Sequence, residues 1–188
     1  MAKRHAVCPW WIGYLLASPV RRLFHDPEKI LAPFVRPGMA VLEPGPGMGF
    51  FTLPLARMVG EGGCVYALDV QEKMLRVLER RAKKAGLFPR IRPRLVKPDS
   101  LDAADLAMKI DLVCALAVVH EMPDCDRFFE EAAATLKPDG LMLLAEPAGH
   151  VSAAEFEAEI DAGARHGLRL VSRPAVRHTQ AALLKKSS

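Results

Sequence analysis

Three places in this chain combine residue types that can take part in chemistry, and each follows an apolar run. The first is Glu43–Gly49, in which an acid precedes three alternating glycines, the second is Asp69, and the third is His120. Carboxylates bind ammonium and hydroxyl groups, and glycines let a backbone pass close beneath a ligand. A histidine can accept a proton near neutral pH. Together these residues indicate a small-molecule site with an acid–base group.

The glycine spacing separates two classes of cofactor. Dinucleotide sites favour G-x-G-x-x-G, whereas here Gly45, Gly47 and Gly49 alternate, and Glu43 stands two positions before the first of them. A carboxylate at this point would repel a diphosphate. It suits a ligand with an ammonium group, ribose hydroxyls and a sulfonium, such as S-adenosyl-L-methionine (SAM). The other interpretation is an ordinary turn rich in glycine and proline.

In these residues the chain resembles the class I, Rossmann-like family of SAM-dependent methyltransferases, and among them the small-molecule enzymes of the ubiquinone/menaquinone C-methyltransferase type. The resemblance covers about residues 35–186. The chain departs from the family at Pro44 and Pro46, which remove two amide donors from the loop. The resemblance implies an α/β fold, a single doubly wound, mostly parallel seven-stranded sheet with an antiparallel last strand, and SAM as the cofactor.

The resemblance also assigns contacts to the cofactor. Asp69 comes twenty positions after Gly49, where an acid is placed to bind ribose hydroxyls, although it could also cap the helix that follows. Asp99 and Ser100 match the loop that receives the adenine, although Asp99 could instead start a turn. Met74, or its apolar neighbours Val70 and Leu101, would cover the adenine faces, although the helical spacing of Met74 also fits packing in the core. The implied cofactor-binding residues are Glu43, Gly45, Gly47, Gly49, Asp69, Val70, Asp99, Ser100 and Ala115.

The run from Ala115 to Asp124 bears most directly on the reaction. Small-molecule enzymes of the resembled type often carry a histidine here, before a helix with an acidic start. His120 would then face the substrate and accept a proton from a hydroxyl, a thiol or an activated carbon. Alternatively, it orders the loop beside the cofactor. Glu121 fits a hydrogen-bonding role in the loop better than a role as base.

The sequence therefore predicts an enzyme that transfers a methyl group to a small-molecule acceptor by in-line displacement, without a covalent intermediate. The Asn-Pro-Pro-aromatic run of adenine methyltransferases and the Pro-Cys nucleophile of cytosine C5 enzymes are both absent. The alternatives are an RNA methyltransferase and a non-catalytic SAM-binding or scaffold protein. An RNA-facing surface would use the basic residues Arg80, Arg81, Lys83, Lys84, Arg90, Arg92, Arg94 and Lys97.

Length and composition limit the number of domains and the cellular environment. The 188 residues suffice for one well-packed domain, and 51% of them are hydrophobic, with a net charge of +4. No apolar run is long enough to span a bilayer. The four cysteines form no C-x-x-C pair, which favours a reducing, cytoplasmic setting and gives no metal site.

The chain is expected to divide into an N-terminal helical extension, residues 1–37, and a SAM-binding methyltransferase domain, residues 38–188. The extension carries Trp10, Trp11 and Tyr14, which are too apolar to trail in water. We expect them to bind the substrate as part of a lid. A membrane-surface anchor, a homodimer contact and a signal peptide are the alternatives.

Hydrophobic periodicity and turn residues give the expected elements. Helices are predicted at 27–31, 52–59, 71–85, 123–136 and 153–166. Strands are predicted at 39–43, 64–69, 91–96, 110–117, 141–146, 168–173 and 179–185, with a turn at 137–140.

Overall fold

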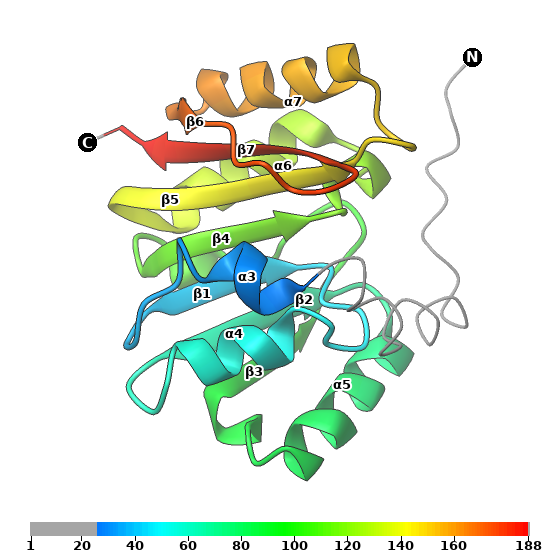
Figure 1. Cartoon of the computed structure of the whole chain (residues 1–188), viewed down its shortest axis with the longest axis vertical. Coiled ribbons are helices and arrows are strands. Elements are labelled where there is room, and N and C mark those ends of the chain that lie inside the picture. The colour runs from blue at the N-terminus through cyan, green and yellow to red at the C-terminus, as the bar shows by residue number, and fades with distance from the viewer. Residues whose placement is uncertain (1–25, 188) are drawn as a thin grey trace.

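The computed structural model describes residues 26–187, which form one seven-stranded sheet with helices on both faces (Figure 1). The strands lie in the order β3-β2-β1-β4-β5-β7-β6, and β7 runs antiparallel to both of its neighbours. This confirms the predicted fold class. The strands are β1 (Ala40–Pro44), β2 (Cys64–Asp69), β3 (Ile91–Leu95), β4 (Ile110–Leu116), β5 (Leu136–Pro147), β6 (Leu168–Ser172) and β7 (Thr179–Lys186).

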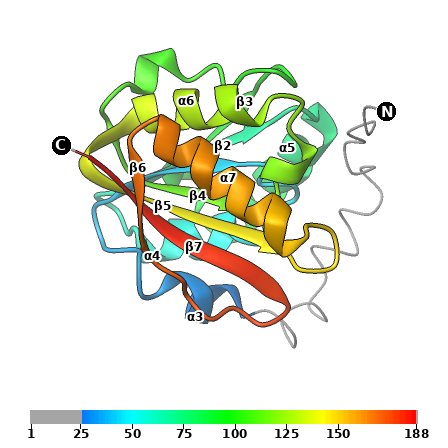
Figure 2. The same ribbon diagram turned by 90° about the horizontal axis from the view of Figure 1, so that it is seen from above.

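The helices divide between the two faces, with α3 and α4 on one side of the sheet and α6 and α7 on the other (Figure 2). Among the described residues, no helix is long and apolar enough to cross a membrane. The helices are α3 (Pro27–Leu31), α4 (Thr52–Met58), α5 (Glu72–Lys84), α6 (Cys125–Thr135) and α7 (Ala153–Arg165), and single 3₁₀ turns are η1 (Phe88–Arg90), η2 (Ala104–Leu106) and η3 (Val119–Glu121).

Alternation along the central strands produces two hydrophobic cores. In β4, Leu112 and Cys114 pack with α3, α4 and α5, whereas Val113 and Ala115 pack with α6 and α7. All four side chains are fully buried. A parallel strand covered on both faces needs a continuous apolar run, and the run predicted as the fourth strand is such a run.

The helix boundaries follow from capping. Asp124 accepts a hydrogen bond from the amide of Arg127, so α6 begins at Cys125 rather than at the predicted Pro123. Ser152 and Glu155 form the predicted capping box of α7. The other predicted helices and strands, apart from β5, agree with the structure to within one residue at each end.

The start of β5 differs from the prediction. The predicted turn at 137–140 lies within the strand as a bulge, since Ile110 pairs with Leu136 and Leu112 pairs with Leu141. Asp139 adopts a φ of 61°, which accommodates the extra residues. The turn residues therefore bend the strand but do not begin it.

The strand order reverses between β1 and β4. The chain runs outward from β1 through β2 to β3 on one side, and from β4 through β5 on the other. The carboxyl ends of β1 and β4 consequently diverge into different loops. In doubly wound sheets this is where ligands bind.

Candidate active site

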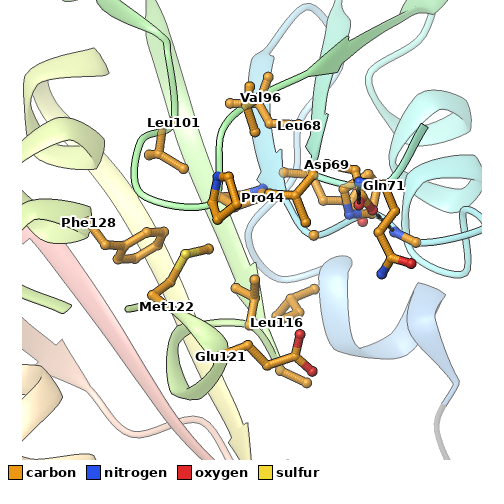
Figure 3. Close-up of a pocket in the computed structure, with 18 of the residues that line it drawn as sticks. Pro44, Leu68, Asp69, Gln71, Val96, Leu101, Leu116, Glu121, Met122 and Phe128 are labelled. Carbon is orange, nitrogen blue, oxygen red and sulfur yellow. Dashed lines mark hydrogen bonds between the residues drawn. The ribbon is translucent and has the colours of Figure 1, made fainter. Parts of the chain in front are cut away.

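A cavity of about 460 Å³ opens at the carboxyl ends of the central strands (Figure 3). Its size suits a small-molecule ligand. In Figure 3, Asp69 and Gln71 lie on one side of the view, and Leu101, Met122 and Phe128 lie on the other. Much of the lining comes from the ends of β1, β2 and β4 and from the loops that follow them, and more of it comes from the loops after β3 and β5 and from α6. The fold therefore brings the three chemistry-bearing regions of the sequence to one site.

The glycine loop fits closely beneath this cavity. Gly45, Gly47 and Gly49 all have positive φ values, of 66°, 53° and 86°, a region that residues with a side chain rarely adopt. A Cβ at position 45 would lie 2.7 Å from Cγ2 of Val118, whereas one at position 47 would meet nothing within 4 Å. Because Gly47 lines the cavity, its bare backbone leaves room for a ligand there.

Asp69, at the end of β2, holds the loops on both sides of it. Its Oδ2 accepts a hydrogen bond of 3.1 Å from the amide of Gly47, and its Oδ1 accepts one of 2.8 Å from the amide of Gln71. Burial raises the pKa of Asp69 to about 6, against the opposing effect of these two amides. Asp69 is not the N-cap of α5, because Gln71 occupies that position. Its carboxylate still borders the cavity, where it can accept hydroxyl groups.

Glu43, at the end of β1, is buried beneath the same cavity. Its side chain is 3% exposed, and its Oε2 has no hydrogen-bond partner. Burial is the main cause that raises its pKa to about 8, and the nearby Asp69 adds to the shift. A cationic ligand above Glu43 would favour the ionised carboxylate. The unpaired oxygen and the open space at Gly47 thus fit SAM, whose ammonium and sulfonium groups carry positive charge.

The loop after β3 also borders the cavity. The Oγ of Ser100 and the amide of Leu101 both donate to the carboxylate of Glu131. Asp99 is mostly exposed, and its Oδ2 lies 3.7 Å from Nη1 of Arg127. Asp99 and Ser100 line the cavity, but Ser100 also anchors the loop. Glu131 was not predicted, since nothing in its sequence position on α6 indicates that it reaches this loop.

Two other predicted cofactor contacts differ in outcome. Val70 lines the cavity, and so does Leu101. Ala115, by contrast, is fully buried within β4 and belongs to the hydrophobic core. Leu116 and Ala117, the next two residues, line the cavity, whereas Ala115 does not.

His120 lies in η3 and borders the cavity, and its ring is hydrogen-bonded to a buried acid. Its Nδ1 lies 2.5 Å from Oε2 of Glu146, the penultimate residue of β5. The other oxygen of Glu146 accepts the amides of Val118 and Val119, at 3.1 and 2.8 Å. The hydrogen bond to Glu146 is the largest cause that raises the pKa of His120, against partial desolvation. Nδ1 is engaged by Glu146, and Nε2, the other ring nitrogen, lies 4.0 Å from Oε1 of Glu121.

Glu146, the partner of His120, was also absent from the sequence prediction. A signal was present, because Glu146 and Pro147 repeat at the end of β5 the acid–proline pair that Glu43 and Pro44 form at the end of β1. The predicted substrate residues Trp10, Trp11 and Tyr14 lie outside the described residues.

Comparison with known proteins agrees with this geometry. Residues 36–180 match a family model described as a methyltransferase domain. The chain is 31% identical over 146 residues to a ubiquinone biosynthesis O-methyltransferase of Azorhizobium caulinodans, covering 77% of this chain and 53% of that protein. It is 35% identical over 112 residues to the nocamycin O-methyltransferase of Saccharothrix syringae, covering 60% of this chain and 39% of that protein. The chain thus spans about half the length of the curated relatives it matches, or less.

The fold agrees along most of the chain with a solved SAM-dependent methyltransferase from Aquifex aeolicus. The TM-score is 0.85 at 25% sequence identity, and the match covers 95% of this chain and 99% of the other. On the family model, the relatives and the shared fold, this chain belongs to the class I SAM-dependent methyltransferases.

Proposed function

We propose that this protein methylates a hydroxyl group on a small, largely apolar acceptor, with SAM as the methyl donor. The observation that carries the proposal is the position of His120. Its ring borders the same cavity as the glycine loop and Asp69, and its Nδ1 is paired with Glu146. A base beside a cofactor site is the arrangement that removal of an acceptor proton requires.

Three groups are assigned to the cofactor. Glu43 would face its positive charge, Asp69 would accept its ribose hydroxyls, and the apolar side chains of Val70 and Leu101 would cover its adenine. Bound SAM supplies a methyl group on a positively charged sulfur and leaves as S-adenosylhomocysteine. Holding donor and acceptor in line accounts for much of the rate enhancement of such a transfer.

His120 would take up the acceptor proton. As the oxygen–carbon bond forms and the carbon–sulfur bond breaks, Nε2 of His120 accepts the hydroxyl proton. The imidazolium that results is stabilised by the carboxylate of Glu146, 2.5 Å from Nδ1. Because this contact raises the pKa of His120, the neutral base forms above the ordinary histidine range, and the rate should rise with pH there.

The lining of the cavity and the names of the relatives both favour an acceptor of this kind. The cavity that His120 borders also has apolar lining, from Phe50, Phe51, Met122 and Pro147. Such a surface suits an aromatic or alkyl group better than a charged polymer. Two relatives are named as O-methyltransferases, which supports oxygen as the methylated atom.

RNA is the alternative acceptor, and the basic residues give it little support. Several of those predicted to face RNA are engaged within the protein. Arg81 donates to the carbonyl of Met48, Lys83 pairs with Glu79, and Arg94 forms a two-point ion pair with Asp105. These contacts use the charges for internal structure, although an ion pair on the surface does not prevent phosphate binding.

The test is methyl transfer from labelled SAM to a panel of hydroxylated aromatic acceptors, with formation of S-adenosylhomocysteine as the readout. Transfer to one of them supports the proposal. Methyl transfer only to RNA would show that the acceptor is RNA and not a small molecule. SAM binding with no transfer to any acceptor would favour a non-catalytic SAM-binding protein.

His120→Ala should then lower kcat by about 10²–10⁴, the usual contribution of a general base. SAM affinity, measured by titration calorimetry, should stay near that of the wild type. His178→Ala is a control, because His178 adopts a surface turn away from the cavity lining. An equal loss of SAM binding and kcat in His120→Ala would make His120 a cofactor-site residue and not a base.

A further inference from the structure

We propose that Glu146 is a positioning residue that keeps the proton of neutral His120 on Nδ1, so that Nε2 presents its lone pair to the acceptor. This inference rests on the proposed function, in which His120 is the base. Glu146 itself does not line the cavity. It would act only through His120.

The contacts of Glu146 leave it one orientation. Its side chain is fully buried, and its Oε1 accepts the amides of Val118 and Val119. These two bonds fix the carboxylate plane against the start of η3. The second oxygen, Oε2, is thereby aimed at Nδ1 of His120, 2.5 Å away. A carboxylate can only accept a hydrogen bond, so Nδ1 must carry the hydrogen.

The two strands that bring this pair together are neighbours in the sheet. His120 follows β4, and Glu146 ends β5, with Leu116 paired to Ala145. The amide of Ala117 donates to the carbonyl of Ala145 at 2.7 Å, which extends the pairing to the foot of η3. The pairing of these two central strands therefore fixes where His120 and Glu146 meet. The position of the imidazole depends on the sheet and not on a flexible loop.

Other ionisable groups face the pair from each side. Oε1 of Glu121 lies 4.0 Å from Nε2 of His120, and the ring of His150 lies 5.8 Å from that of His120. From α7, Glu159 contributes a buried carboxyl, 8% exposed, whose Oε2 has no partner. Burial and the charge of Glu146 raise the pKa of Glu159 to about 8.

The raised pKa of Glu159 keeps it protonated at neutral pH. Within this buried pair, Glu146 is the acid bonded to the imidazole and to two amides. Cys125, at the start of α6, also lies near Glu159, and burial raises the pKa of its thiol to about 12. On this side of the imidazole, Glu146 makes the hydrogen bond to Nδ1, while burial favours the neutral forms of Glu159 and Cys125.

The experiment compares wild type with Glu146→Gln. The amide oxygen of glutamine can still accept from Val118 and Val119, but its NH₂ group would then face Nδ1. That arrangement favours the opposite tautomer of His120, with hydrogen on Nε2 and no lone pair toward the acceptor. We expect kcat to fall at least about tenfold, without exceeding the loss in His120→Ala.

A nuclear magnetic resonance titration of ¹⁵N-histidine-labelled protein reads the tautomer directly, with His120→Gln to assign the signals. Wild type at high pH should show hydrogen on Nδ1. In Glu146→Gln the hydrogen should move to Nε2, and the pKa of His120 should fall, since its anionic partner is lost. The acid limb of the pH–rate profile should shift to lower pH in parallel.

Glu157→Gln is the matched control, because Glu157 lies on the outer side of α7 and pairs with Arg173. It should leave the tautomer, the pKa and kcat unchanged. An unchanged tautomer and pKa in Glu146→Gln would overturn the inference, even if the rate fell. If wild type methylates no acceptor, the proposed function fails, and the titration still decides the role of Glu146.

Discussion

At the scale of single residues, Asp69 combines a structural and a ligand-binding role. Its two oxygens hold the amides of Gly47 and Gln71, and the same carboxylate borders the cavity. Replacing it removes a ligand partner and loosens the glycine loop at the same time. The binding energy of SAM should therefore be more sensitive to this residue than to any exposed acid nearby.

We expect Asp69→Ala to weaken SAM by about 1–3 kcal/mol, the scale of an unmet buried polar partner. Titration calorimetry at pH 7.5 measures this. Because the pKa of Asp69 in the free protein is raised to about 6, wild-type affinity should also fall as the pH drops below 6, and that dependence should be weaker in the variant, in which only Glu43 contributes to it. Glu79→Gln is a control on the exposed face of α5. Wild-type affinity in Asp69→Ala would remove Asp69 from the ribose site.

At the scale of elements, the glycine loop and η3 are in direct contact. Gly45 follows β1, Val118 precedes η3, and the missing Cβ at position 45 is what lets them meet. The loop assigned to the cofactor thus packs against the segment that carries His120. Movement of one element would displace the other.

Gly45→Ala should lower the free energy of unfolding for two separable reasons. The new methyl group would lie 2.7 Å from Cγ2 of Val118, and the φ of 66° is strained for alanine by about 1–2 kcal/mol. Adding Val118→Ala removes the clash but not the strain.

Chemical denaturation of the two single variants and the double variant measures the coupling. The double variant should be more stable than the sum of the single losses predicts. Gly62→Ala is the control, since its Cβ would meet only an ordinary contact at 3.8 Å. Strict additivity would show that the two elements do not press on one another.

The elements also show how far the sequence alone could lead. Local signals, such as the capping box at Ser152 and the apolar run of β4, depend on neighbouring residues, and they predicted the corresponding elements correctly. The bulge at the start of β5 depends on pairing with β4, a strand that lies far from it in the sequence. The pairing of His120 with Glu146 likewise arises only when two strands lie side by side. Such contacts between distant segments carry no period or motif.

At the scale of the whole molecule, buried acids at the site oppose stability. Glu43 and Glu159 both have pKa values raised to about 8, chiefly by burial. Between the ordinary glutamate pKa and pH 8, the folded chain holds protons that the unfolded chain releases. The free energy of unfolding therefore falls as the pH rises through this range.

Glu43→Gln should reduce the decrease in the free energy of unfolding with rising pH, because glutamine stays neutral at every pH. We expect the variant to match wild type near pH 4 and to melt at a higher temperature at pH 8, with weaker SAM binding. Thermal unfolding across this pH range measures the difference. Glu61→Gln, at a site where the side chain is 94% exposed, should leave the profile unchanged. A variant that is less stable than wild type at pH 8 would contradict this account of Glu43.

The unpaired oxygen of Glu43 has a consequence for the protein in the cell. A ligand that satisfies this group binds only the folded chain, and it adds about 2.7 kcal/mol of stability at about 100 times its Kd. Proteases act on the transiently unfolded fraction, which shrinks accordingly. The half-life of the protein should therefore follow the supply of methyl donor, so that cells depleted of SAM would hold less of an enzyme that consumes it.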